Sequence, residues 1–449
     1  MPGASVARWS MSYFAAALAC LLAGLALMAA GFGYPSQPAQ APDTLVVVHL
    51  VALGWLSALM LGALTQFVPV LVSQKLYSDR APPIVLACHF LGLAGLLGGF
   101  VGLGRSWRSS VFLLPAGGLL LSLGFALAIL NLGATLARNR PLAAPARIVA
   151  AGLASLPIVF GLGVVFTLAL GGWAPGAGAA RLLADDLSIH AAAGLGGWLT
   201  LTAFGVSYRL LAMFMLAPDA GGRLTEAVFW LGAGALIMLL QAVPGASPRL
   251  ILAPRVLAVV FGSAAVAIYL WEVAGLFRQR KRRKLELNSK MSAVALAWLA
   301  VAAIALPASL AAEAPSPAPE TLLFIAAFGW LTGLGLAMLY KIVAFLTWLE
   351  CYGHWLGKRR TPRVQDLVRE ERALPWFVLY HVAVLCGAAA LMLQWGVAFR
   401  FASLAMLCAA AAIGLEVLRI RRLAAVPAEL APPEGPPPLL FSRLRPTNA

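Results

Sequence analysis

Long apolar stretches separated by short polar segments make up most of this chain. Twelve of them reach the length that an α-helix needs to cross a bilayer. They lie near residues 9–33, 44–73, 82–104, 110–136, 147–172, 187–216, 224–244, 250–277, 292–312, 321–349, 374–394 and 397–418. The pattern predicts an all-α polytopic membrane protein with about 12 transmembrane helices.

The composition supports the same fold class. Hydrophobic residues make up 61% of the chain and charged residues only 11%, and a soluble protein of this size could not bury so much apolar surface. We expect residues 1–422 to form a single transmembrane domain. Residues 423–449 are rich in Pro and are expected to be a disordered cytoplasmic tail.

One short phrase, Gly-Trp-Leu followed by Ser or Thr, occurs three times, in the second, sixth and tenth spans. Its copies are residues 54–57, 197–200 and 329–332. A recurrence at this spacing indicates repeated structural units. We therefore expect three quasi-equivalent repeats of four helices each, near residues 9–136, 147–277 and 292–418.

The match continues after each Trp. Seven residues later stands a small residue (Gly62, Gly205 or Ala337), and eleven residues later a polar one (Gln66, Arg209 or Lys341). On an α-helix these offsets return close to one face, so each copy is expected to present a single stripe that begins with the Trp. The small residues would let helices approach closely, and the cations would reach the membrane surface.

Charge placement predicts the orientation. With the amino terminus inside, all but six of the 33 Lys and Arg residues fall on the inner side, and a dense run occupies residues 278–290. Both termini are then cytoplasmic in a bacterial-type inner (plasma) membrane. The formal net charge of +16 fits this rule and contact with anionic lipid, and we expect the lipid bilayer, not nucleic acid, as the partner.

Two histidines stand near the outer ends of the second and sixth spans. His49 precedes the first Trp by six residues and His190 precedes the second by eight. Imidazole at this depth suits haem iron or copper, while a hydrogen bond to a neighbouring helix is the alternative. Asp186, one turn before His190, could orient that ring beside a metal or could simply cap the helix.

The remaining ionisable groups are assigned structural roles. His89 and His381 lie toward the inner halves of their spans, away in depth from the first pair, and His354 falls in an inner loop where we expect it to be solvated. Glu272, near the inner end of the eighth span, is expected to pair with the basic run that follows.

Twelve helices in three groups of four, with His49 and His190 in the second and sixth spans, resemble subunit I of the haem–copper oxidases. The phrases 49–55, 62–69 and 205–211 are also similar to those of oxidase-related bacterial proteins, including the NnrS-type haem–copper membrane proteins of nitric oxide response. The resemblance implies that His49 binds a haem b and that His190, with Asp186 beside it, binds copper.

The chain departs from the oxidase pattern at the catalytic centre. In that family the seventh span supplies a His pair and the tenth supplies two His, yet residues 225–244 and 321–349 contain no His here. No ligand set for oxygen reduction is left. We therefore do not expect a functional oxygen reductase, and whether the chain is an enzyme stays open.

Three functions are compatible with these features. The first is an oxidase-like membrane protein that binds haem or copper near the outer face, for electron transfer, gas sensing or metal handling. The second is a cofactor-free transporter, although the commonest twelve-span carriers repeat every six helices and not every four. The third is an assembly or scaffold protein with partners among other membrane or respiratory subunits.

Overall fold

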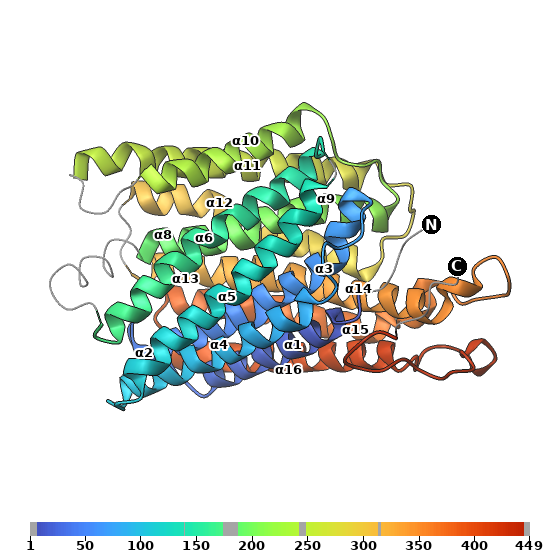
Figure 1. The fold of residues 1–449 in the computed structure, drawn as a ribbon, viewed down its shortest axis with the longest axis horizontal. Coiled ribbons are helices and arrows are strands. Elements are labelled where there is room, and N and C mark those ends of the chain that lie inside the picture. The colour runs from blue at the N-terminus through green and yellow to red at the C-terminus, as the bar shows by residue number, and fades with distance from the viewer. Residues whose placement is uncertain (1–6, 139, 174–186, 242–247, 313–315, 444–449) are drawn as a thin grey trace.

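The computed structural model describes residues 7–138, 140–173, 187–241, 248–312 and 316–443. These residues form helices and connecting segments and contain no strand. Twelve helices among them are long and apolar enough to cross a membrane, and they run along the long axis of the molecule (Figure 1). The prediction of an all-α polytopic membrane protein is confirmed.

Most spans in the described chain are continuous α-helices. They are α1 (Ser10–Ala29), α4 (Ala81–Gly104), α5 (Ser110–Ala137), α6 (Ala144–Leu170), α10 (Arg223–Gln241), α11 (Pro248–Arg278), α12 (Leu287–Ala311), α15 (Glu370–Met392) and α16 (Gly396–Arg421). Short 3₁₀ helices η4 (Gly353–Trp355), η5 (Val364–Leu367) and η6 (Ala428–Leu430) lie outside the spans.

The second, sixth and tenth spans each change helix type part-way across. Each begins as an α-helix, continues as a π-helix and ends as an α-helix. The segments are α2 (Pro42–His49), η1 (Leu50–Ser57) and α3 (Ala58–Val72); α8 (Leu187–Ala192), η2 (Ala193–Leu201) and α9 (Thr202–Met215); and α13 (Ala318–Phe324), η3 (Ile325–Thr332) and α14 (Gly333–Tyr352).

The three π-helices coincide with the three copies of the repeated phrase. Their wider turn appears in the hydrogen bonds that end η1 and η3: the Ala58 N–H donates to the carbonyl of Leu53, five residues back, and the Gly333 N–H to that of Phe328. π-helical turns are rare and concentrate at functional sites. Their recurrence at equivalent positions shows that the repeat in the sequence is also a repeat in structure.

The tryptophans of the phrase link the three copies into a closed cycle. The Trp198 indole N–H donates to the Ser57 hydroxyl at 3.0 Å. Trp330 donates to Thr200 at 3.4 Å, and Trp55 donates to Thr332 at 3.0 Å. Each Trp thus binds the Ser or Thr of a different copy, and all three indoles are buried.

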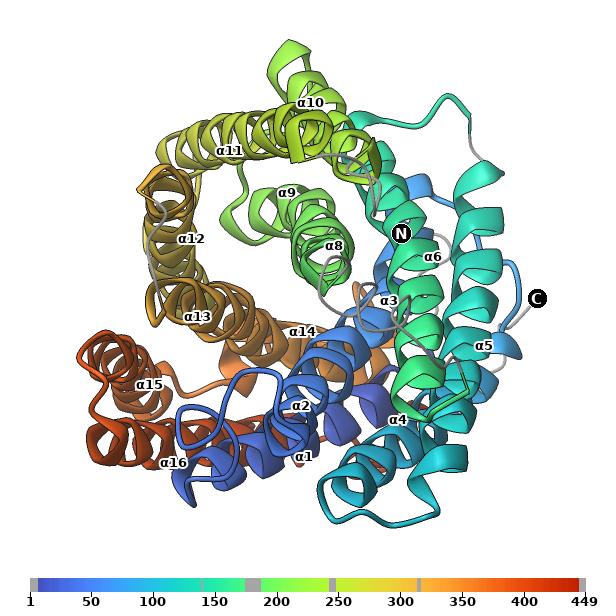
Figure 2. The ribbon, with the colours of Figure 1, turned by 90° about the vertical axis from the view of Figure 1, so that its left-hand side faces the viewer.

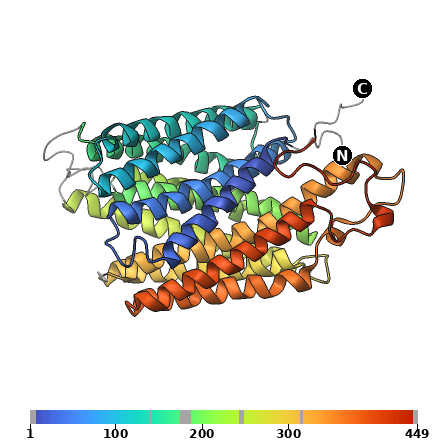
Figure 3. The same ribbon diagram turned by 90° about the horizontal axis from the view of Figure 1, so that it is seen from below.

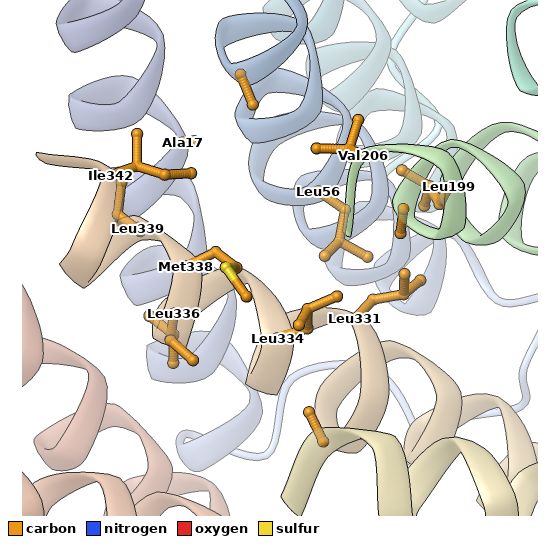
Figure 4. Close-up of a cluster of buried hydrophobic side chains, with 14 of the residues drawn as sticks. Ala17, Leu56, Leu199, Val206, Leu331, Leu334, Leu336, Met338, Leu339 and Ile342 are labelled. Atoms are coloured by element: carbon orange, nitrogen blue, oxygen red, sulfur yellow. The ribbon is translucent and has the colours of Figure 1, made fainter. Parts of the chain in front are cut away.

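The leucines of the phrase pack together at the centre of this cycle. Leu56, Leu199 and Leu331 are each at most 5% exposed. Figure 4 shows them close together, with Leu334 and Val206 beside them. We call the second, sixth and tenth spans the inner helices, or inner spans. Viewed along the spans, they are surrounded by the other helices (Figure 2). The buried apolar core therefore lies where the three repeats meet.

The glycine of each phrase faces the first helix of its own repeat. A Cβ added to Gly54 would lie 2.8 Å from Cys20 on α1, and one added to Gly197 would lie 2.7 Å from Ser155 on α6. At Gly329 the obstacle would be Trp298 on α12, again at 2.7 Å. Only glycine allows these approaches, so each repeat is a four-helix module with its inner span seated on its first helix.

Neighbouring modules pack through their outer helices. The last helix of one module contacts the first helix of the next: α5 lies against α6, α11 against α12, and α16 against α1. The third contact returns to the first module, so the modules close into a ring around the inner helices (Figure 2).

The expected single stripe along each inner span is divided between two faces. Gly62 approaches Tyr13, where an added Cβ would lie 2.6 Å from the Tyr Cβ, and Gln66 accepts a hydrogen bond from the Ala7 N–H at 2.7 Å. Both partners belong to the first span and its approach, whereas Trp55 points to the third module. The single stripe was predicted for an α-helix throughout. The π-helical turns of η1 change the direction in which Trp55 points relative to the residues of α3. Close approach at the small residue is confirmed.

Part of the tail for which the sequence suggested disorder is held by specific contacts. The Ser442 N–H donates to the Arg8 carbonyl at 2.9 Å, and the Arg443 N–H donates to Glu350 at 2.8 Å. The Arg421 guanidinium also donates to two tail carbonyls. The chain after α16 therefore folds back toward the start of α1, and the first and last described residues lie at the same end of the bundle (Figure 3).

We name the two ends of the bundle by their side chains. The basic end carries the connections at residues 279–286 and 353–369 together with Arg8 and Ser442. The histidine end is the opposite one, where α2, α8 and α13 begin (Figure 1).

The cycle can be tested through Thr332, whose hydroxyl accepts from Trp55 and donates to the Ala327 carbonyl at 2.8 Å. Thr332→Val keeps the shape and removes the acceptor. We expect the free energy of unfolding in detergent micelles to fall by about 1–2 kcal/mol, because the buried indole N–H loses its partner.

Thr321→Val is the matched control, since the Thr321 hydroxyl donates to the carbonyl of Pro317, the residue directly before α13 in the same module. Its loss should be at most about half as large. Equal losses for the two variants would show that the inter-module bond contributes no more than a local one.

Candidate functional site

His49 is the last residue of α2, directly before η1. Its Nδ1 lies 2.8 Å from the Leu45 carbonyl, and since a carbonyl only accepts, Nδ1 carries the proton. The neutral ring then keeps a lone pair on Nε2. The Phe100 ring stands 5.0 Å away, centroid to centroid. The backbone thus fixes the ring orientation and leaves one nitrogen able to bind a metal.

His190 lies on α8, at the same end of the bundle. Its ring packs against Phe166 of α6 at 5.5 Å and lies beside the Val159 carbonyl. Its Nδ1 is buried and has no hydrogen-bond partner among the described residues. A Cβ added to Gly163 would stand 3.6 Å from Cε1 of this ring. His190 therefore also offers a nitrogen that no described group uses.

The two imidazoles belong to different modules but lie close enough to interact electrostatically. Asp186, which the sequence placed beside His190, falls outside the described residues. Within the described chain, no group of three or more His, Cys, Asp and Glu side chains is arranged to hold a metal ion. The described site is therefore a pair of imidazoles.

The third module places only apolar side chains at the corresponding position. Phe324, at the end of α13, packs against Phe328 at 5.0 Å and against Phe399 at 5.6 Å. As the sequence indicated, this copy offers no ligand there, and the histidine pair breaks the threefold symmetry.

His89 makes a contact that the sequence could not suggest. Its Nε2 lies 3.0 Å from the carbonyl of Leu53, the residue before the phrase glycine. In the third module the Tyr380 hydroxyl donates at 3.0 Å to the carbonyl of Phe328, which occupies the same position. In both modules the third helix satisfies the same backbone group of the π-helix, which supports the structural role assigned to His89.

His381 and His354 occupy different environments. His381 is 7% exposed, stands against Gly333, and has no hydrogen-bond partner on either ring nitrogen among the described residues. His354, in the connection after the tenth span, is exposed and stacks beside Trp355 at 4.5 Å. Neither residue joins the His49–His190 pair.

The polar residues that follow each phrase form separate contacts at the basic end. Arg209 meets Asp219 at 2.5 Å, with both side chains exposed. Lys341 instead lies inside the protein, 2.5 Å from Glu286, with exposures of 8% and 10%. The expectation that both cations reach the membrane surface is wrong for Lys341, because Glu286 at the start of the ninth span pairs with it internally.

The expectation for Glu272 is also wrong. Its carboxylate accepts hydrogen bonds from the Tyr208 hydroxyl at 2.6 Å and the Thr225 hydroxyl at 2.8 Å, and not from the basic run after α11. Tyr208 follows the phrase Trp by ten residues, so the inner span itself supplies the donor. Glu272 is therefore bound by other helices of its own module and not by the residues that follow it in sequence.

Two comparisons with known proteins found no match. A scan of protein-family models matches none of them, and no curated protein matches the chain. What can be said of function therefore rests on the site itself.

The buried ion pair at the basic end can be tested with Glu286→Gln. This change leaves the Lys341 ammonium buried without a counter-charge and also removes the pair between Glu286 and Arg282. We therefore expect about 3–5 kcal/mol less stability in denaturant unfolding of the micellar protein.

Asp219→Asn breaks the exposed pair with Arg209 and serves as the control. Exposed pairs contribute less than about 1 kcal/mol. Comparable losses of stability in both variants would mean that burial of the Lys341 ammonium does not depend on its pairing with Glu286.

Proposed function

We propose that this chain is a multi-pass membrane protein that binds a haem b or a copper ion through His49 and His190. The main support is that two imidazoles from different modules lie at one end of the bundle, each with a ring nitrogen that no described group uses. Imidazole nitrogen suits both haem iron and copper. The residues present therefore fit such a group.

The surroundings of the pair support the same proposal. The Leu45 carbonyl fixes the His49 ring, as the second hydrogen bond of a ligating histidine commonly does. Phe100 and Phe166 pack against the two rings, and a Cβ added to Gly163 would stand in ordinary contact with His190, 3.6 Å from its Cε1. When bound, the iron or copper would supply reversible exchange of one electron, which serves electron transfer, gas sensing or metal handling.

The positions of the basic residues support the orientation that the sequence suggests. The first and last described residues and the runs at 278–284 and 358–363 occupy the basic end, which we assign to the cytoplasmic side of a bacterial-type inner membrane. The histidine pair then lies near the outer face, within reach of external electron donors, gases or metal ions.

The alternatives receive less support. Oxygen reduction would need further ligands, and residues 225–244 and 321–349 contain no His. A transport path along the threefold axis would meet Leu56, Leu199 and Leu331, which are packed together and buried. A cofactor-free scaffold stays compatible with the fold, and the experiment below separates it from the proposal.

The test is an absorption spectrum of the protein purified from membranes, reduced minus oxidised, combined with elemental analysis for iron and copper. We expect one of these metals in the wild type. His49→Ala and His190→Ala should each lower its content at least about tenfold, because each removes a ligand.

His354→Ala removes an imidazole from an exposed connection and should keep the full metal content. A wild-type protein that contains neither iron nor copper would reject the proposal and favour the scaffold.

A further inference from the structure

A pocket at the basic end combines arginines with an apolar wall. It lies where α15 begins and α16 ends, two helices that contact each other along their length. Its lining includes Arg369, Arg372, Arg419 and Glu416, with Leu367 and Ile420 on the apolar side. The histidine pair lies at the opposite end of the bundle, so this pocket belongs to a different site.

The charges in the pocket do not cancel. Arg372 Nε stands 3.0 Å from Glu416 Oε1, and Arg419 Nη1 stands 2.5 Å from the same oxygen. The Arg369 side chain is exposed and makes no hydrogen bond or ion pair within the described chain. Arg372 and Arg419 thus share one carboxylate and Arg369 contacts none, so the lining carries three positive charges against one negative. Glu370 and Glu371 stand next to Arg369 along the chain, outside the lining.

The shared carboxylate also positions the two guanidiniums. Glu416 is only 6% exposed in its side chain, whereas Arg372 and Arg419 are each 44% exposed. A guanidinium carries five N–H donors in a fixed plane, and each arginine presents one of its nitrogens to Glu416. Both arginine side chains are partly exposed, and a guanidinium suits the oxygens of a phosphate.

The surface next to the pocket is apolar and faces outward. Trp376 lies one turn along α15 from Arg372 and is 37% exposed, and Leu415 lies one turn before Arg419 on α16 and is 53% exposed. Both positions are inside transmembrane helices, one turn deeper than the arginines. A molecule with its phosphate among the arginines could lay a hydrocarbon chain along this surface.

We propose that this pocket binds the headgroup phosphate of an anionic phospholipid from the leaflet at the basic end. Basic pockets beside transmembrane helices on the cytoplasmic side recognise such headgroups. The pocket offers both an excess of positive charge and an apolar surface at bilayer depth. A free phosphate would use only the charge, so the combination favours the lipid.

The experiment measures lipid binding to the full chain in detergent by native mass spectrometry, with phosphatidylglycerol titrated against phosphatidylcholine. We expect selective retention of phosphatidylglycerol by the wild type. Arg369→Gln should weaken it about fivefold, the effect of one cation near an anionic lipid, without touching any internal contact. Arg372→Gln with Arg419→Gln should weaken it further, and the double Lys variant, which keeps the charge, should recover part of the affinity.

Arg360→Gln is the matched control, because Arg360 is exposed in a connection of the same end and lies outside the pocket lining. It should leave phosphatidylglycerol binding unchanged. Equal weakening by Arg360→Gln and Arg369→Gln would overturn the proposal in favour of general surface charge. Displacement of the lipid by millimolar inorganic phosphate would overturn the lipid assignment in favour of a soluble anion.

Discussion

An indole N–H buried in a membrane protein needs an acceptor from the protein, since no water is there to receive it. In this molecule the acceptor is a hydroxyl two residues after the corresponding Trp, in another copy of the same phrase. Donor and acceptor are therefore present in every module, and each of the three bonds joins two different modules. The cycle Trp198–Ser57, Trp330–Thr200 and Trp55–Thr332 fixes how the inner spans are rotated, and the leucine core and the glycine contacts follow from that rotation.

The same rotation determines where the unusual side chains lie. His49 and His190 precede the π-helices of the first two modules and reach the same end of the bundle, while the third module fills the equivalent place with Phe324. The Trp and Ser or Thr residues that join the modules recur in all three copies, whereas the histidines are present in only two.

The sequence predicted the spans and the three modules well, because span length and the repeated phrase depend on local composition. It could not predict the π-helices, which shift the phase between Trp55 and Gln66, so an expected single stripe became two faces. It also paired Glu272 with its neighbours in sequence, whereas Tyr208 and Thr225 bind it across the module. Lys341 and the tail depend on partners far away in the chain, Glu286 and Arg8, which no local pattern specifies. For the site, the sequence proposed His49 and His190. The hydrogen bond that fixes the His49 ring to the Leu45 carbonyl required the structure.

The direction of the tryptophan cycle also bears on how the protein is made. A membrane protein is synthesised from its amino terminus, and its early segments fold first. Trp198 can find Ser57 as soon as the sixth span is in place, and Trp330 can find Thr200 on arrival of the tenth. Trp55 is the first of these three tryptophans to be synthesised, but its acceptor Thr332 is the last of the three hydroxyls. The Trp55 indole N–H of the first module therefore has no access to this acceptor until the third module is in place.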